Sequence, residues 1–232
     1  MNTDGLRSAD DWPGTDARIE RARILFDHAL FKDDPGALEE ADLELDAVEA
    51  DLALARGQII HGRFLAQRTG DPRWDKEDPQ ELELFERAAR LYEQWDDRRG
   101  HAEALFWIGC FHQVVRRDNE TAVPLLERSL ELAALEDDKR TMSEALRHLG
   151  IAEHGAGRLD QARERLEESV RLRREIGFLP GVAGNLVGLS YIAAGQGRRE
   201  DALALIEEAT AIAKANGDRG ILHQLEEARA AL

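Results

Sequence analysis

Apolar residues recur every three or four positions along most of the chain, and this spacing is typical of amphipathic helices. In the stretch EALRHLGIAEHGAG, residues 144–157, one helical stripe contains Leu146, Leu149 and Glu153. A second stripe follows at Ala162 and Leu166. The alternation of β-branched and polar residues that favours strands is almost absent from the sequence. The pattern therefore predicts an all-α chain.

The helical pattern repeats at an interval of 40 residues in the C-terminal half of the chain. The pairs at this interval are Leu146 and Leu186, Leu149 and Leu189, Gly157 and Gly197, Ala162 and Ala202, Leu166 and Ile206, Ser169 and Ala209, and Gly177 and Gly217. One step upstream, the interval is again 40 in the second helix of the unit and 41 in the first. Each unit thus contains two helices, with a glycine turn between them where a positive φ costs little, and a second glycine ends the unit.

The repeated positions carry a motif. In residues 144–177 it consists of Leu146, Leu149, Gly150, Gly157, Ala162 and Ser169. The motif resembles the tetratricopeptide repeat (TPR) family, and the match is specific over residues 103–217. The resemblance implies a right-handed superhelical α-solenoid of helix-turn-helix pairs, whose small residues let two helices approach closely. A step of 40 residues exceeds the family's usual ~34 and is similar to the longer repeats of bacterial TPR regulators and sensor domains.

The first hundred residues follow the motif less closely. We expect helices over residues 16–31, 36–49, 50–67 and 81–95, and a loop over 68–80 between Pro72 and Pro79. In the third of these helices, Ile60 and His61 align with the Leu-Gly pair. The predicted domains are a flexible tail (1–15) and a single helical-repeat domain (16–232), divided into a divergent part (16–100), clear repeats (101–217) and a capping helix (218–232).

Composition narrows the classes of partner. The 232 residues carry a formal net charge of −16, which disfavours nucleic acid and anionic membrane surfaces as partners. There is one cysteine, and we find neither a secretory signal at the N-terminus nor an apolar run of the ~18–20 residues that a membrane span needs. We therefore expect a cytoplasmic protein that binds neither nucleic acid nor membrane.

In TPR proteins the first helix of each unit lines a concave groove, and helical spacing selects the residues that would face it. The candidate ligand-binding residues are Phe106, Trp107, Gln113, Glu144, Arg147, His148, Ile151, His154, Val187 and Tyr191. Apolar and aromatic residues bordered by polar ones mark binding surfaces. The alternatives are that Phe106 and Trp107 pack against the next helix and that His148 and His154 are ordinary half-buried or exposed histidines. Cys110, on the same stripe, fits a small buried apolar residue.

Catalytic and metal chemistry find little support. His148 and His154 are six residues apart, which rotates them by ~120° and separates them by ~9 Å along one helix, too far to chelate one ion. No zinc, calcium or nucleotide-binding motif occurs in the sequence. A thiol nucleophile at Cys110 would need His148, one repeat away, close in space. We expect no catalytic residue, no metal and no cofactor.

The sequence therefore predicts a non-catalytic, regulatory scaffold that binds a peptide or protein segment in its groove. The alternative is a sensor that encloses a small molecule or a short signalling peptide. An enzyme that uses the His and Arg side chains of the groove is a third hypothesis. A fourth is a homodimer formed through the terminal helix or the groove.

Overall fold

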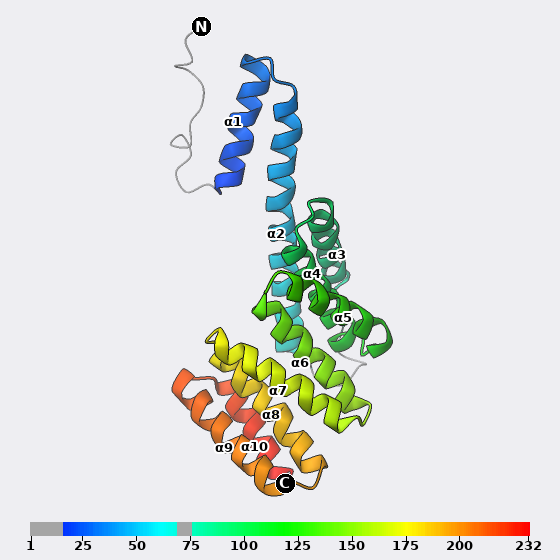
Figure 1. The fold of residues 1–232 in the computed structure, drawn as a ribbon, viewed down its shortest axis with the longest axis vertical. Coiled ribbons are helices and arrows are strands. Elements are labelled where there is room, and N and C mark those ends of the chain that lie inside the picture. The colour runs from blue at the N-terminus through cyan, green and yellow to red at the C-terminus, as the bar shows by residue number, and fades with distance from the viewer. Residues whose placement is uncertain (1–15, 69–75) are drawn as a thin grey trace. The chain divides into compact units, whose positions relative to one another are not determined.

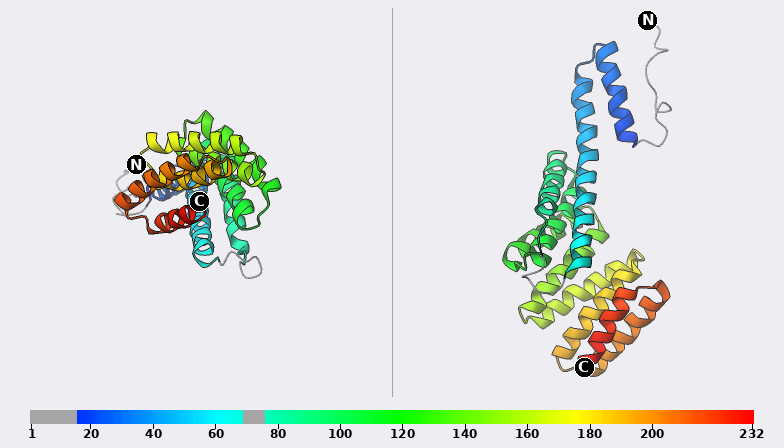
Figure 2. Two further views of the ribbon diagram at one scale, coloured as in Figure 1. Left: turned by 90° about the horizontal axis from the view of Figure 1, so that it is seen from below. Right: turned by 180° about the vertical axis from the view of Figure 1, so that it is seen from behind.

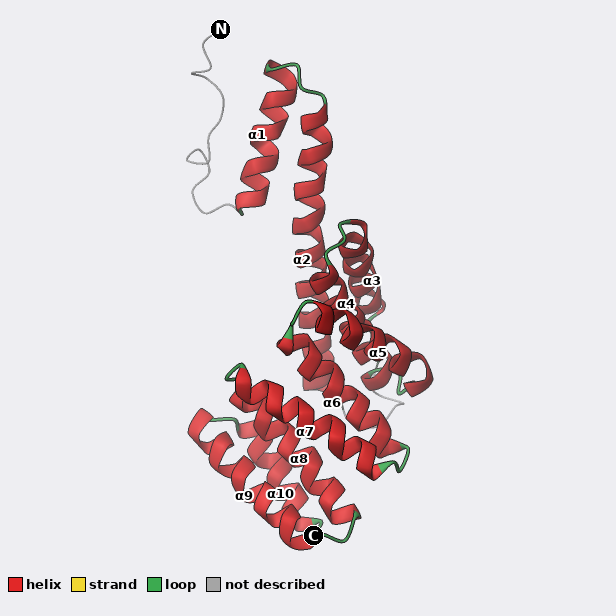
Figure 3. Cartoon of the chain, in the orientation of Figure 1, coloured by secondary structure: helices red, strands yellow, loops and turns green. Residues whose placement is uncertain are grey.

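The computed structural model describes residues 16–68 and 76–232, which form ten helices joined by short loops, with no strand among them (Figures 1 and 3). The all-α prediction is confirmed. The predicted tail, residues 1–15, and Pro72 of the predicted loop lie outside the described residues. Contacts group the chain into two compact units, residues 1–104 and 105–232, and each is described by itself. None of the described helices combines the length and apolarity needed to cross a bilayer.

The first unit begins with a hairpin of α1 (Ala17–Phe31) and α2 (Gly36–Gln67). Asp16 caps α1 by accepting a hydrogen bond from the backbone N–H of Arg18 at 2.9 Å. Between the two helices lies a small core that consists of Ala22, Leu25, Ala37 and Ala41. Its small side chains let the helices approach closely, but they bury little apolar surface.

α2 is one continuous helix of 32 residues, so the prediction of separate helices over 36–49 and 50–67 is wrong. No glycine or proline lies between Gly36 and Gly57, and the boundary at Glu49 carries no stop signal. Ala50 continues the helix and is buried. The change of apolar face along α2 reflects a change of packing partner, from α1 to α3, rather than the end of a helix.

α3 (Pro79–Gln94) packs against the second half of α2, and its contacts correct the predicted register. A Cβ at Gly57 would lie 2.5 Å from the Phe85 ring, so Gly57, rather than His61, permits the close approach. His61 instead forms a buried pair with Glu81, with 2.7 Å between Nδ1 and Oε1. The Leu-Gly position therefore lies four residues before the predicted one.

α4 (Arg98–Val114) continues from the first unit into the second, which also contains α5 to α10. Their bounds are α5 (Asn119–Leu135), α6 (Lys139–Gly155), α7 (Leu159–Glu175), α8 (Leu179–Gly195), α9 (Arg199–Asn216) and α10 (Arg219–Ala230). Consecutive helices from α5 to α10 pack side by side (Figure 2). The predicted small residues Ala122, Ala162 and Ala202 are fully buried where these helices meet.

The turns of the second unit repeat one backbone geometry. Gly157 and Gly197, at the turns within the pairs, have φ of +75°, as predicted. Gly177 and Gly217, at the turns between pairs, have φ of +71° and +76°. Asp137 has the same left-handed geometry 40 residues before Gly177, with φ of +49°. The turn is thus retained at a position where the sequence has no glycine.

α10 packs on α8 and α9 and ends the described chain. Leu225 and Ala228 are buried, and Ile221 and Leu232 pack against the same cluster, as the amphipathic pattern predicts. The polar side of the helix, with Gln224 and Glu227, is exposed.

Candidate functional site

The first helices of the pairs, α6 and α8, carry most of the residues predicted to meet a partner. Leu149 and Gly150 of α6 are buried, and Gly150 faces Leu166 of α7 at 3.1 Å, measured from its ideal Cβ position. The opposite side of these helices is here called the first-helix face. It consists of Glu144, Arg147, Ile151 and His154 of α6 with Gly184, Val187, Tyr191 and Ala194 of α8, spaced three or four residues apart on each helix.

Arg147 joins α6 to α8. Its Nη1 donates to the Gly184 carbonyl oxygen at 3.0 Å and to Asn185 Oδ1 at 2.8 Å. A Cβ at Gly184 would lie 3.9 Å from Nη1, so the absence of a side chain there leaves room for the guanidinium. Arg147, predicted to hold a ligand, thus has a structural role in addition to any contact with a partner.

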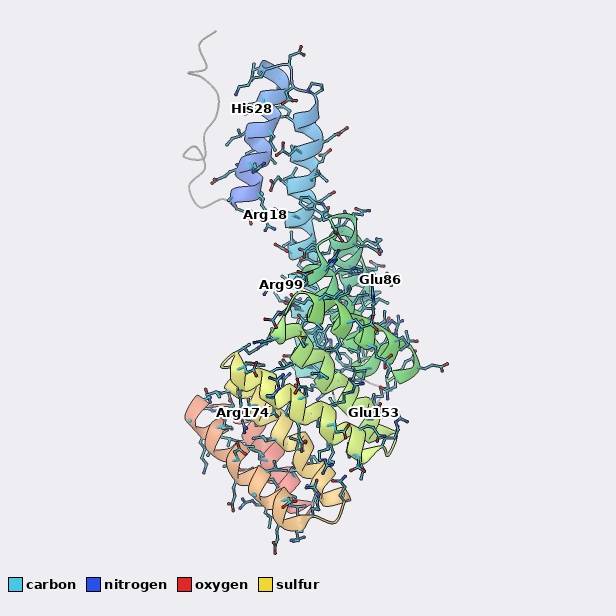
Figure 4. All side chains as sticks on the ribbon, viewed as in Figure 1. Arg18, His28, Glu86, Arg99, Glu153 and Arg174 are labelled. Atoms are coloured by element: carbon cyan, nitrogen blue, oxygen red, sulfur yellow. The ribbon has the colours of Figure 1, made fainter. Side chains whose placement is uncertain are left out.

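Arg173 of α7 reaches the same acceptor from the other side. Its Nη1 donates to Asn185 Oδ1 at 3.0 Å and to the Gly181 carbonyl oxygen at 2.8 Å, and Nη2 pairs with the Glu144 carboxylate. Asn185 in turn donates from Nδ2 to Ser169 Oγ at 2.7 Å. A buried polar network therefore holds α6, α7 and α8 together. In contrast Arg174, the next residue, pairs with Glu208 at the surface and is labelled in Figure 4.

The surroundings of the two arginines change their acidity. Burial lowers the pKa of Arg147, and the neighbouring Glu144 carboxylate opposes this change. Burial also lowers the pKa of Arg173 to about 10, with Glu144 opposing the change and the cations of Arg147 and Arg140 adding to it. Arginine guanidinium groups stay protonated in proteins at neutral pH. The face therefore has an excess of positive charge at its α6–α8 junction, within a chain of net charge −16.

His148 turns away from the first-helix face and packs against α4. Its Nδ1 lies 2.6 Å from Gln113 Oε1, and its backbone oxygen accepts from Gln113 Nε2 at 3.0 Å. Its Nε2 lies 3.9 Å from the Cys110 sulfur, and its ring meets the Phe106 ring edge-on with 5.3 Å between centroids. His148, Gln113 and Phe106 thus join α4 to α6, as the alternative interpretation of half-buried packing residues proposed.

Two further candidates are core residues. Phe106 is buried in a cluster with Cys110, Leu126 and Leu149, and Trp107 packs against that cluster. Val187 lies on the first-helix face by its spacing, but it is covered there as part of a second buried cluster that spans α7 to α10. Their apolar side chains stabilise the stack, and neither Phe106 nor Val187 presents a surface to a partner.

Three candidates remain exposed on the first-helix face. Ile151 is 41% exposed and Tyr191 38%, and the two residues lie 40 positions apart at equivalent points of α6 and α8. His154 is exposed one turn after Ile151. Within residues 16–68 and 76–232, no group of three His, Cys, Asp or Glu side chains is arranged to hold a metal ion. The chemistry that the face offers is therefore apolar contact, with a cation and an imidazole beside it.

Comparison with known proteins agrees with this architecture. A family model described as tetratricopeptide repeat matches residues 111–175 and 141–215. The repeats of residues 111–215 match the tetratricopeptide repeat family, as their motif predicts. No curated protein matches the TPR chain significantly.

Solved structures similar to the TPR chain include two with kinesin light chain in their descriptions. One is a putative kinesin light chain from Podosopora anserina with nearly identical TPR-like repeats, at 16% identity and a TM-score of 0.49, covering 79% of this chain and 94% of the other. The second is BtubC (BKLC) from P. vanneervenii, at 18% identity and a TM-score of 0.45, covering 88% and 94%.

Within the TPR repeats, the sequence reasoning missed Arg173 and Asn185. Arg173 lies four residues after the buried Ser169, which places it on the buried stripe of α7. Asn185 is a polar residue within the apolar stretch VAGNLVGLS. A charged and an amide side chain at core positions predict a polar network, because buried polar groups need partners. That signal was present in the sequence.

Proposed function

We propose that the chain is a non-catalytic TPR scaffold that binds a segment of a partner protein on the first-helix face. The observation that carries the proposal is the exposure of Ile151 and Tyr191 at equivalent positions of adjacent repeats. Exposed apolar and aromatic side chains that lie near each other and are bordered by polar groups are typical of an interaction surface. TPR repeats generally mediate protein–protein interactions.

The charges beside these residues favour an acidic partner segment. Arg147 lies one turn before Ile151, and both of its hydrogen bonds to α8 leave from Nη1. A guanidinium has five N–H donors, so those on Nε and Nη2 can serve a carboxylate of the partner. In this arrangement Ile151 and Tyr191 act as apolar anchors, and the guanidinium sets the position of the segment between them.

The test captures partners from an extract on the immobilised chain and compares variants. The variant I151S/Y191S removes the two anchors and leaves the core intact. The control variant L135S/I176S changes two other exposed apolar residues that lie at the ends of α5 and α7. We expect the first pair to reduce capture of the specific partners by about tenfold or more and the control to retain it. Equal capture by both variants would exclude this face.

A regulatory role stays part of this proposal. A separate measurement on the wild-type chain addresses the small-molecule alternative. A dialysable compound that raises the melting temperature of the wild-type chain, with no macromolecular partner bound, would favour the sensor hypothesis over the scaffold.

A further inference from the structure

Exposed apolar side chains concentrate on the α1–α2 hairpin rather than on the repeats. Nine large apolar residues of α1 and α2 are exposed, against five in residues 105–232, among the residues that the structure describes. Among the described residues, α1 is the only helix that packs on the first half of α2. Soluble proteins rarely expose large contiguous apolar surfaces. The exposed apolar surface of the hairpin is therefore typical of a surface that binds another protein chain.

Four of these residues form a row along one side of α2. Leu38, Leu45, Leu52 and Ile59 follow one another at seven-residue intervals and are between 44% and 57% exposed. The positions three residues further on are Ala41, Val48 and Ala55. Apolar residues at alternating steps of three and four are the pattern by which one long helix packs along another.

The helices of the same chain cover this row only in part. Arg18, at the first turn of α1, donates from Nη1 to Asp51 of α2 at 2.7 Å, so α1 extends along α2 only as far as Asp51 (Figure 4). Leu52 and Ile59 lie beyond that end. Over the half that α1 does reach, an open cleft of about 410 Å³ remains between the helices, lined by Ile19 and Phe26 of α1 and by Leu38 and Leu45 of α2.

α3 packs mainly on the opposite side of α2, and where it approaches the row it leaves an open cleft that Ile59 lines. The α2 residues buried on that side are Ala50, Ala53, Leu54 and Gly57, and Gly57 faces the Phe85 ring. Leu52 lies between these positions in sequence and Ile59 follows them, but both project from the other side of the helix, as their exposure shows. Within the part of the chain that the structure describes, both halves of the row are thus accessible to another helix.

The charges beside the row change sign along its length. The residues four positions after each row residue are Asp42, Glu49, Arg56 and Arg63. Glu49, at the middle, is already paired with Arg87 of α3, whose Nε donates to it at 2.6 Å. The first half is therefore acidic and the second half basic, which is the distribution expected of two identical helices that pack in opposite directions.

We propose that the α1–α2 hairpin binds the hairpin of a second copy of this chain, with the two α2 helices antiparallel. Leu45 then packs on Leu52 of the second copy and Leu38 on Ile59, while Asp42 meets Arg56. The α1 helix of each copy then lies against the second half of α2 in the other copy, the half that the other copy's α1 does not reach. Four helices together enclose the apolar row. A two-fold arrangement of this kind is the commonest type of homo-oligomer.

The first test measures the mass of the full-length chain in solution by sedimentation over roughly 1–100 µM. We expect twice the mass of one chain. The variant L45E/L52E should be monomeric or raise the dissociation constant by about 100-fold or more. The matched control is L43E, which changes a residue of α2 with similar exposure on the other side of the helix. Circular dichroism shows whether each variant keeps its helix content.

A monomeric wild-type chain across this range would overturn the proposal, as would a well-folded L45E/L52E variant that still dimerises. Dissociation of L43E to the same extent would also overturn it. The variant I151S/Y191S should still dimerise. Failure of the proposed dimer can therefore be distinguished from failure of partner binding on the first-helix face.

A charge exchange tests the orientation. The variant R56E places a carboxylate opposite Asp42 of the second copy and should weaken the dimer by about fivefold or more. The double variant D42R/R56E restores opposite charges in an antiparallel pair and should recover the affinity. Failure of the double variant to recover affinity, with both variants folded, would exclude the antiparallel arrangement.

Discussion

Asn185 provides the shared hydrogen-bond acceptor of the buried polar network in the repeats. Its side-chain oxygen accepts from two guanidinium groups, Arg147 and Arg173, and its amide donates to Ser169. Each arginine also bonds a backbone carbonyl of α8. The two cations therefore share one neutral acceptor, and the Glu144 carboxylate supplies the only charge in this group that opposes them among the described contacts.

We predict that N185A destabilises the chain by about 2–4 kcal/mol, because it leaves two buried cations short of an acceptor. Urea denaturation followed by circular dichroism measures the loss. The control is N216A, which removes an exposed amide bonded to the Ile212 carbonyl and should change stability by no more than about 0.5 kcal/mol. Equal losses for the two variants would show that the network contributes nothing beyond a surface hydrogen bond.

The sequence indicates which residues lie on the first-helix face but not what each one touches. Helical spacing identifies Ile151 and Tyr191, and both are exposed. The same spacing selects Arg147, whose acceptors on α8 lie 37 and 38 residues further along the chain. It also selects Phe106, which is buried because α6 covers it. Contacts between helices decide these cases, and a single helical stripe cannot report them.

Among the helices, α2 and α3 show how the repeat geometry is maintained outside the clear repeats. The Phe85 ring lies over Gly57 much as Leu166 lies over Gly150. Phe85 is 41 residues before Leu126, which itself faces Gly109. The first unit therefore has the same glycine contact as the TPR repeats, with a larger side chain filling it.

We predict that G57A destabilises the chain by about 1–3 kcal/mol, because the new methyl group would overlap the Phe85 ring. G62A, in the same helix with nothing within 4 Å, should instead stabilise it by about 0.5–1 kcal/mol through helix propensity. Thermal denaturation of both variants provides the measurement. The double variant G57A/F85L should lose less stability than the sum of the two single losses, since leucine occupies this position in the repeats. Additive losses would contradict the contact.

The helices themselves could be predicted because their apolar periodicity is strong, and the observed bounds differ by only a few residues. The predicted break in α2 was wrong because a change in the apolar face resembles the end of one helix and the start of another. The register error has a different cause. Gly57 and His61 lie one helical turn apart, and only the contact with Phe85, 28 residues away, distinguishes them.

At the scale of the whole molecule, the hydrophobic clusters of the second unit include one near its start and one near its end. One joins Phe106, Cys110, Ala122, Leu126 and Leu149, and the other spans α7 to α10. In a stack of repeats, stability depends mainly on each repeat and its immediate neighbours. A destabilising substitution at one end of the second unit should therefore lower the stability of the nearby helices and leave the distant ones unchanged.

We predict that L225A, which truncates a buried side chain of α10, destabilises the C-terminal end by about 2–5 kcal/mol. Hydrogen exchange followed by mass spectrometry should show faster exchange in α9 and α10 and little change in α5. Faster exchange throughout α5 to α10 would instead show that the second unit unfolds as a single cooperative block.

The recurrence of the left-handed turn has a consequence for the length of the chain. Gly157 and Gly197 share one backbone geometry 40 residues apart. A deletion that joins the chain before Gly157 to the chain from Gly197 onwards would keep that turn and place Ile206 opposite Gly150, where Leu166 lies now. The same junction accepts an inserted unit of 40 residues. A gene for such a protein can therefore gain or lose whole modules by recombination without creating a new kind of joint.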